Sequence, residues 1–388
     1  MVYNLLEFPE ANPQNRELIL RDILTEFPPD IFMVCELQSD LGADFILNTA
    51  LNVNNILYDK ATFVPNQSGN ANLQQLLFFR KDKFILEAEE ILQTNIRDIN
   101  HYTLTLRTAD IQNNPVRIEI FIGHLKSSEG GSNEQQRLEM VLEFTSKLEA
   151  LDPNAFVIFA GDFNIYSSTE PAYIELLDTT NAITMLDPID TPGAWSGNIN
   201  FQDIHTQSTR VSSGPFGAGA GGGLDDRFDF ILLSENMLSD PTFRYIPNTY
   251  KAFGNNGNCF DQSINNTQCF GSFNATLREN LYNMSDHLPV IIEFETDQEI
   301  ILLNTPSPKT QMATFSIPKT IVSQFLEIQN TNDHPIELQM ISTLGQHITH
   351  ISLKSRESVT LDVSYLPTGV YYVTDTFKIT GVKKFIKQ

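Results

Sequence analysis

The chain has 388 residues, of which 41% are hydrophobic and 10% aromatic, a composition typical of a folded protein with one large and one small domain. Residues 301–388 hold 8 of the 25 basic and 6 of the 48 acidic residues, so nearly all of the net charge of −23 belongs to the first 300 residues. A domain with this much negative charge repels polyanions at long range, and a phosphate-bearing ligand would need a local site with bound cations. No stretch reaches the roughly 18 apolar residues needed to cross a bilayer, which argues against stable membrane insertion.

Predicted strands and helices alternate along the first 300 residues. Residues 1–6 form the first predicted strand, and because it starts at Met1 we expect that a leader has been removed ahead of it. Further strands are predicted at 30–37, 73–80, 115–125, 155–164, 227–234 and 287–295. This order predicts an α+β fold in which layered sheets are covered by helices.

Two helices are predicted among these strands. The first spans residues 13–27, where apolar residues recur at helical spacing between Pro13 and Pro28. The second spans residues 132–151, with Ser132 or Asn133 as its N-cap. Its predicted apolar face consists of Leu138, Val141, Leu142 and Leu148.

Residues 191–283 are rich in Gly, Asn, Ser and aromatic residues and mostly lack periodicity, so they are predicted to be a large loop insertion around one strand. Gly217, Gly219 and Gly222 fit a GxGxxG pattern. They precede a strand instead of following one and opening a helix, and a dinucleotide-binding role is therefore rejected.

Three cysteines are present. Cys259 and Cys269 lie in a loop-like Asn/Gly-rich stretch, where a disulfide is favoured over two buried thiols. Cys35 sits inside an apolar run and is predicted to be an inert core thiol.

The chain is predicted to divide into a domain of residues 1–298, a linker of residues 299–311 and a second domain of residues 312–388. The linker contains "NTPSPKT". The last segment alternates apolar and polar residues with turns every 8 to 12 residues, which predicts a small all-β sandwich.

Polar side chains of related chemistry interrupt or terminate the predicted strands. They are Asn4, Glu36, His124, Asp162, Asn164, Asp229, Asp286 and His287. Any one alone is more often a cap, a surface charge or a structural histidine. Together they would supply oxygen ligands for Mg²⁺ or Mn²⁺, amide donors for phosphate oxygens and imidazoles that move protons near neutral pH. The set predicts phosphoryl transfer, and zinc or acyl-transfer chemistry fits less well because the sequence has no HExxH and no GxSxG.

The motifs "YNLL", "CELQ", "GHLKSS", "GDFN", "DFILLS" and "SDHLPV" follow the order and spacing of the endonuclease/exonuclease/phosphatase superfamily, which residues 1 to about 296 resemble. The resemblance implies a four-layer α/β/β/α sandwich, in which two packed mixed sheets are flanked by helices. It also implies that Glu36 is the principal metal ligand, helped by Asp286. Asn4 and Asn164 would bind phosphate or position the metal.

The same resemblance assigns the proton chemistry. Asp162 would orient or deprotonate the attacking water. His287, oriented by Asp229, would be the acid/base, and His124 would hydrogen bond the scissile phosphate.

One departure from deoxyribonuclease I concerns the partner of His124. The family member has a Glu on the strand that matches residues 73–80, whereas this chain offers Gln74 and Gln75. A neutral partner stabilises imidazolium less, so His124 is predicted to bind phosphate in preference to acting as a general acid. Arg80 ends the same strand and is either a surface charge or a substrate contact.

The insertion holds further candidates in "DIHTQSTR". His205 and Arg210, close to Asp203, belong either to a solvated loop or to a rim that contacts substrate. Trp195 either stacks on a base or pins the loop.

The end of the chain carries a second resemblance. "STLGQHITH", "LPTGVYYVTD" and "KKFIKQ" resemble the C-terminal sorting domain that Bacteroidetes use for type IX secretion, although "IPKT" replaces its usual Pro-Asn-Pro opening. The alternative is an ordinary spacer or carbohydrate-binding sandwich. The resemblance implies a secreted or cell-surface protein whose partner is the secretion machinery, in agreement with the expected disulfide.

The sequence favours an extracellular phosphodiesterase that depends on Mg²⁺ or Mn²⁺ and acts as a monomer. DNA is the favoured substrate and RNA an alternative. An additional Ca²⁺ site is left open. A lipid phosphodiesterase of the sphingomyelinase kind would expose an apolar hairpin beside the site, for which Phe253, Phe260, Phe270 and Phe273 are candidates. A phosphomonoesterase is a further alternative. An inactive phosphate-binding module is disfavoured because every metal and acid/base position is filled.

Overall fold

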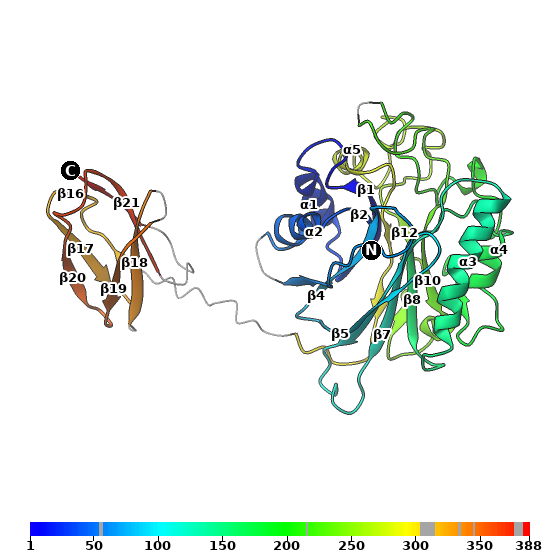
Figure 1. The fold of residues 1–388 in the computed structure, drawn as a ribbon, viewed down its shortest axis with the longest axis horizontal. Helices are drawn as coiled ribbons and strands as arrows, with labels where there is room; N and C mark the ends of the chain where they lie inside the picture. The colour runs from blue at the N-terminus through cyan, green and yellow to red at the C-terminus, as the bar shows by residue number, and fades with distance from the viewer. Residues whose placement is uncertain (54–56, 215, 303–314, 333–334, 344–345, 376–382) are drawn as a thin grey trace. The chain divides into compact units, whose positions relative to one another are not determined.

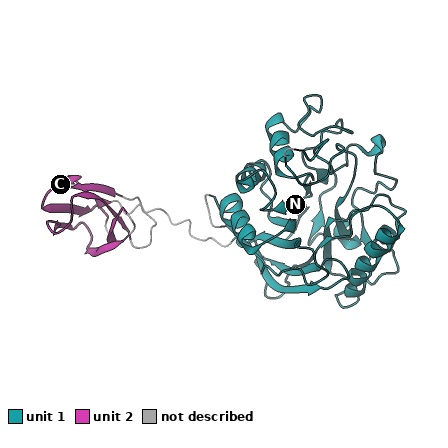
Figure 2. Ribbon diagram, turned by 45° about the horizontal axis from the view of Figure 1, so that its top comes forward, with its two compact units in different colours: residues 1–303 teal, residues 304–388 magenta. Residues whose placement is uncertain are grey.

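The computed structural model describes residues 1–53, 57–214, 216–302, 315–332, 335–343, 346–375 and 383–388. They belong to two compact units, residues 1–303 and residues 304–388 (Figure 2). Within the described ranges, no helix combines the length and apolar character that a bilayer crossing would require.

Two six-stranded sheets form the centre of the first unit. The first has the strand order β12 (Lys251–Ala252), β13 (Val290–Ile291), β1 (Val2–Phe8), β2 (Ile31–Leu37), β4 (Gln74–Arg80) and β3 (Tyr58–Lys60). The second has the order β5 (Phe84–Leu92), β6 (Ile99–Leu106), β7 (Arg117–His124), β8 (Phe156–Asp162), β10 (Asp229–Ser234) and β9 (Met185–Leu186). Both sheets are mixed, because β1 and β2 are parallel, as are β7 and β8, while the other neighbours are antiparallel.

The central strands are apolar on both faces because each sheet is covered on both sides. Between the sheets the contact is close, and the Cys35 thiol donates to the carbonyl oxygen of Gly123 over 3.6 Å. Cys35 is a buried free thiol, as predicted.

Helices cover the two outer faces (Figure 1). On the side of the first sheet lie α1 (Arg16–Glu26), α2 (Asp40–Phe45), the π-helix η1 (Ile46–Leu51) and α5 (Ala275–Met284). On the side of the second lie α3 (Gly131–Leu148) and α4 (Pro171–Leu176), and short 3₁₀ turns occur at η2 (Ile199–Phe201) and η3 (Glu235–Leu238). The predicted four-layer α+β sandwich is confirmed.

The predicted helices exist, with shifted ends. The first starts at Arg16 instead of residue 13, after Asn15 in the left-handed conformation. In α3 neither Ser132 nor Asn133 is the N-cap; Gly130 takes that position with a φ of 105°, which glycine adopts without strain. Leu142, assigned to the apolar face, is exposed, because the face that packs on the second sheet runs through Val141 and Phe144.

The predicted strand at 287–295 is interrupted. It divides into β13 and β14 (Phe294–Glu295), and β14 pairs with β11 (Arg244–Tyr245) in a separate two-stranded sheet. Strands β3, β5, β6 and β9 were not predicted. Nor was α5 inside the insertion, although Asn274 is a local signal for it, since its side chain accepts from the N–H of Leu277.

The insertion is tied together by the predicted disulfide, which joins Cys259 to Cys269. A bridge that closes so short a loop contributes about 2–3 kcal/mol in the chain-entropy account. Both sulfurs are buried in the apolar core that surrounds the first sheet.

The predicted linker starts too early. Backbone hydrogen bonds attach residues 299–301 to the first unit, from the N–H of Ala109 to the carbonyl of Glu299 and from the N–H of Ile301 to the carbonyl of Arg107. Residues 303–311, and with them "NTPSPKT" and the predicted domain start at 312, lie outside the described residues.

The second unit is a small β-sandwich. One sheet has the order β15 (Phe315–Ser316), β17 (Phe325–Asn330) and β20 (Ser358–Asp362); the other has the order β16 (Ile321–Val322), β22 (Lys383–Lys387), β21 (Gly369–Asp375), β18 (Ile336–Ser342) and β19 (His347–Leu353). Alternating apolar residues from both sheets form a separate core.

Candidate active site

Strand register brings the polar strand ends to one place. In the second sheet, Asp162 at the end of β8 lies directly opposite His124 on β7 and Asp229 on β10. In the first sheet, Asn4 on β1 pairs with Cys35, one residue before Glu36. The two sheets therefore bring side chains from five strands to the same edge of the sandwich.

Asp162 Oδ2 is the atom on which the contacts converge. It lies 3.0 Å from Asn4 Nδ2, 3.3 Å from His124 Nε2 and 3.7 Å from His287 Nε2. Asn4 Nδ2 also donates to Glu36 Oε1 over 3.0 Å and so joins the two carboxylates. The Asn4 side-chain oxygen accepts from the N–H of Leu6, so its nitrogen is the atom that faces the carboxylates.

Two of these residues have strained backbones. Glu36 has a φ of 61° and Asn164 a φ of 52°, in the left-handed region that costs a non-glycine residue about 1–3 kcal/mol. The N–H of Glu7 donates to Glu36 Oε2 and fixes this carboxylate, and the N–H of Asn164 donates to Asp162 Oδ1 and holds the Asn164 backbone. Strain of this kind concentrates at functional sites, where it aims a side chain.

The cluster has the chemistry of a divalent-cation site. Glu36, His124 and Asp162 each offer a ligand atom, and these atoms lie within 4.8 Å of one another. Burial and then the neighbouring Asp286 raise the pKa of Glu36. Burial raises the pKa of Asp162 to about 7, and Asp229 and Glu36 add to the effect. Carboxylates crowded in this way fit a cation, whose charge would relieve the repulsion.

The predicted ligand set of Glu36, Asp286 and Asn4 is not the set that the structure groups most closely. Asp286 Oδ2 instead accepts from the N–H of Ala220 over 2.6 Å and from Gln207. Glu36, His124 and Asp162 are the group of three ligand candidates found among the described residues. The additional Ca²⁺ site stays a prediction.

His287 and Asp229 form a buried pair. His287 Nδ1 lies 2.7 Å from Asp229 Oδ2, which fixes the ring and directs Nε2 toward Asp162. Burial opposes the charged imidazole, but the carboxylates of Asp229, Asp162 and Asp286 together raise the pKa of His287 well above its ordinary value. This is the geometry of a general base with an orienting carboxylate.

His124 lies in a different electrostatic environment. Burial, and then the charges of Arg97 and His287, hold its pKa well below the ordinary value. Its Nδ1 has no hydrogen-bond partner among the described residues, Gln74 and Gln75 included, and the Gln74 amide donates to Asn72 instead. A neutral imidazole suits a hydrogen-bond donor to phosphate better than a general acid.

Arg80 is not at this site. Phe79 lies opposite Ile31, the first residue of β2, whereas Glu36 is near the other end of that strand. The Arg80 guanidinium is paired with Asp82 and Asp30. The predicted substrate contact is therefore wrong, because β4 runs antiparallel to β2 and ends at the opposite edge.

His205 and Arg210 are buried and cannot form an exposed rim. His205 Nε2 lies 2.9 Å from the carbonyl oxygen of Trp195, and Trp195 packs against Tyr173 in the apolar core between the second sheet and helices α3 and α4. Arg210 donates to the carbonyl of Tyr282. His205, Arg210 and Trp195 thus hold the insertion together, which is a structural role and not contact with substrate.

The sequence prediction missed the groups that the insertion contributes. Gln207 contacts both Asp286 and His287, and the Gly-rich stretch covers Asp286. A Cβ on Gly219 would lie 2.9 Å from the Asp286 carboxyl carbon, which explains why a glycine stands there. In the sequence, the run of glycines is the one signal that could have indicated this contribution from the insertion.

Solved structures of other proteins share this fold. The D. rerio TDP2 structure complexed with single-strand DNA product is 17% identical, with a TM-score of 0.51 over 76% of this chain and 97% of that chain. A D. rerio TDP2 humanized by 14 mutations is 16% identical, with a TM-score of 0.50 and the same coverage. An endonuclease/exonuclease/phosphatase family protein from Bacteroides thetaiotaomicron is 16% identical, with a TM-score of 0.47 over 76% of this chain and 94% of that one. The first unit therefore shares its fold with the two D. rerio TDP2 structures.

The C-terminal unit has its own match. Residues 318–388 match the family described as "Secretion system C-terminal sorting domain". This confirms the predicted type IX secretion to the cell surface or the extracellular space. No curated protein matches the chain.

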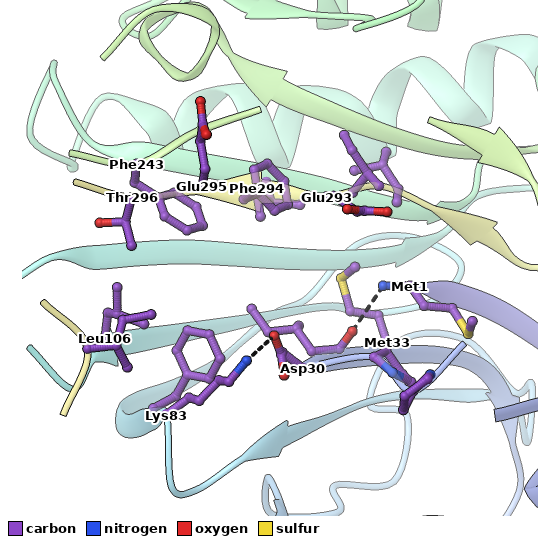
Figure 3. Close-up of a pocket in the computed structure, with 18 of the residues that line it drawn as sticks. Met1, Asp30, Met33, Lys83, Leu106, Phe243, Glu293, Phe294, Glu295 and Thr296 are labelled. Atoms are coloured by element: carbon purple, nitrogen blue, oxygen red, sulfur yellow. Dashed lines mark hydrogen bonds and ion pairs between the residues drawn. The ribbon is translucent and has the colours of Figure 1, made fainter. Parts of the chain in front are cut away.

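A cavity of ≈ 420 Å³ lies between residues that include Met1, Lys83 and Phe294 (Figure 3). It is lined mainly by apolar residues around Met1 and Met33, and Lys83 is paired with Asp30 at its edge. The starts of β1 and β2 line it, whereas Asn4 and Glu36 lie further along these strands. It is therefore separate from the candidate active site.

Asp225, next to the site, gives a prediction about stability. Burial, and then Asp226 and Asp261, raise the pKa of Asp225 from 3.8 to about 7. The folded state then binds this proton more tightly than the unfolded state, so stability is lost as the pH rises between these two values. Allowing for solvent screening of a half-buried group, we expect Asp225→Asn to raise the unfolding temperature by about 2–4 °C at pH 8 and to change it little at pH 4.

Thermal melts in EDTA at the two pH values measure this difference. Asp203→Asn, at an exposed acidic residue of the same insertion, is the matched control. An equal gain at pH 4 and pH 8 would show that charge is not the cause.

Proposed function

We propose that this protein is a secreted hydrolase of phosphoester bonds that depends on a divalent cation and acts on the phosphodiesters of nucleic acid. The observation that carries the proposal is the convergence on Asp162 Oδ2 of an amide and two imidazoles, one of them paired with a carboxylate. Core packing does not require such a set, and polar groups of this kind are costly to bury unless they have a role.

The residues divide the work as follows. Asp162 orients the attacking water. The surrounding carboxylates raise the pKa of His287, so Nε2 would take the proton of that water once a bound cation offsets the charges of Asp162 and Asp286, and Asp229 would stabilise the imidazolium. His124 and Asn164 donate hydrogen bonds to the nonbridging phosphate oxygens. Glu36, with carboxylate help from Asp162 or Asp286, would hold Mg²⁺ or Mn²⁺. The cation would supply neutralisation of the charge on the phosphate and on the leaving oxygen.

The donors around the cluster favour a diester over a monoester. Asn4 and Asn164 are neutral amides, and the lowered pKa of His124 keeps its imidazole neutral as well. The nearby guanidinium of Arg16 is occupied by the main-chain carbonyls of Leu5 and Met284. Neutral donors match the single negative charge of a diester better than the two charges of a monoester.

A nucleic acid fits better than a lipid surface. Of the four phenylalanines considered for an apolar hairpin, Phe253 is buried, Phe260 and Phe273 are half-buried, and Phe270 alone is exposed. One exposed ring is a small membrane anchor. A structure of the same fold contains a single-strand DNA product, which makes DNA the first substrate to test. Action as a monomer stays a prediction.

The proposal is tested with a substrate panel of plasmid DNA, RNA, sphingomyelin, bis-p-nitrophenyl phosphate and p-nitrophenyl phosphate. We expect turnover of the nucleic acid and of the diester with Mg²⁺ or Mn²⁺, complete loss in EDTA, and little turnover of the monoester. Asp162→Asn, which preserves shape and removes charge, should abolish the activity. Turnover that persists in EDTA, or a preference for sphingomyelin, would replace the proposal with another.

A further inference from the structure

Gln207 is held firmly beside the cluster by its main chain. Its N–H donates to the carbonyl of Asp226 over 3.0 Å, and its carbonyl accepts from the N–H groups of Asp225 and Asp226 over 2.9 and 2.7 Å. Asp226 lies three residues before β10, which begins at Asp229. The position of Gln207 is thus fixed relative to the strand that carries the orienting carboxylate, while its side chain is half-buried and accessible.

The side-chain amide lies between Asp286 and His287. Gln207 Nε2 is 3.2 Å from Asp286 Oδ2 and 2.6 Å from His287 Nε2. A carboxylate accepts hydrogen bonds, so the amide atom near Asp286 is the nitrogen. One of its hydrogens is then used on Asp286, and the other points at the imidazole nitrogen that faces the reaction.

This second hydrogen lies where the substrate must arrive. The other nitrogen of His287 is occupied by Asp229, so Nε2 is the atom that exchanges a proton at the site. A phosphate that brings its water within reach of Nε2 also comes within reach of the Gln207 amide. The bond to Asp286 keeps the amide in place, and its second hydrogen, which points at Nε2, is also within reach of a phosphate oxygen that approaches this nitrogen.

An amide suits this position better than a charged group. A lysine here would pair with Asp286, and a carboxylate would repel both Asp286 and the phosphate. The neutral donor adds a hydrogen bond on the His287 side of the phosphate.

We propose that Gln207 is a substrate-binding residue whose amide, anchored on Asp286, donates a hydrogen bond to a nonbridging oxygen of the scissile phosphate. The inference rests on the proposed function, because it assigns the group that binds the phosphate of the same diester. It concerns a residue of the insertion, outside the strand-end motifs.

Steady-state kinetics on bis-p-nitrophenyl phosphate with saturating Mn²⁺ test the inference in Gln207→Ala and Gln207→Glu. A lost hydrogen bond to an anionic oxygen corresponds to a fall in kcat/KM of about 10–100-fold for the Ala variant, and the Glu variant should fall further through repulsion. The shape of the pH profile should not change. Gln202→Ala, five residues earlier in the same insertion, is the matched control and should keep wild-type kinetics.

The outcomes separate the two proposals. Wild-type turnover with an unchanged or increased kcat/KM in Gln207→Ala would refute the inference alone, since the amide would then merely cover His287. A displaced pH profile in the Ala variant would also overturn it, because the residue would then act by positioning the imidazole. A wild-type protein that turns over no substrate would end the proposed function and this inference with it. Unfolding temperatures of both variants within about 2 °C of the wild type show that folding is intact.

Discussion

Replacing His287 with Ala should lower kcat on a phosphodiester by about 10²–10⁴-fold, the range that a positioned general base contributes. The substitution removes the imidazole that faces Asp162 and leaves Asp229 buried without its partner. Because the phosphate-binding donors stay in place, KM should change much less than kcat. Initial rates on bis-p-nitrophenyl phosphate and on plasmid DNA measure the effect, with the Mn²⁺ concentration held saturating.

His347→Ala is the matched control, since His347 is exposed in the second unit and should leave kcat unchanged. Asp229→Asn should show an intermediate loss, because the amide keeps the shape of the carboxylate but stabilises the imidazolium less. Undiminished turnover in the His287 variant would remove the general base from the mechanism and leave Asp162 as the group that activates water.

The core of the site could be predicted because each of its residues carries a local signal. Asp162 ends one apolar run and Asp229 begins another, and both runs can only be buried strands. Burying a charged residue there costs free energy unless several polar side chains come together. Strand register then places His124, Asp162 and Asp229 side by side. The resemblance to a known family gave the same set.

Arg80 shows where this reasoning stops. It ends an apolar strand, as Asp162 does, yet it lies at the other edge of the sandwich because β4 is antiparallel to β2. A sequence pattern shows that a strand ends at a given residue but not at which edge of the sheet it does so. Strand direction depends on long-range pairing, which leaves no local trace.

Gln207 could not be found for the opposite reason. It lies in an aperiodic segment, and its position depends on hydrogen bonds to Asp226 and on contacts with Asp286 and His287, about 80 residues away. His205 and Arg210, in the same stretch, have equally suggestive chemistry and turn out to be buried supports. Among polar residues in a long loop, burial and direction decide the role, and neither follows from residue type.

Glu36→Gln should weaken the binding of Mn²⁺ by at least about 10–100-fold and lower activity at moderate Mn²⁺ to a similar degree. The carboxylate is the only group of the cluster held by both a strained backbone and two hydrogen bonds, from Asn4 and from the N–H of Glu7. The amide keeps the size of the side chain but removes the charge that a divalent cation requires. Isothermal titration with Mn²⁺ measures the affinity without any need for turnover.

The thermal shift gives a second readout that does not depend on catalysis. Mn²⁺ at 100 times its dissociation constant stabilises a protein by about 2.7 kcal/mol, so the wild type should unfold several degrees higher with the ion than in EDTA, and the Glu36 variant should not. Glu143→Gln, at an exposed position of α3, should behave as the wild type. A Glu36 variant that binds Mn²⁺ as tightly as the wild type would move the cation away from Glu36, leaving Asp286, already bonded to Gln207 and Ala220, as the next ligand to test.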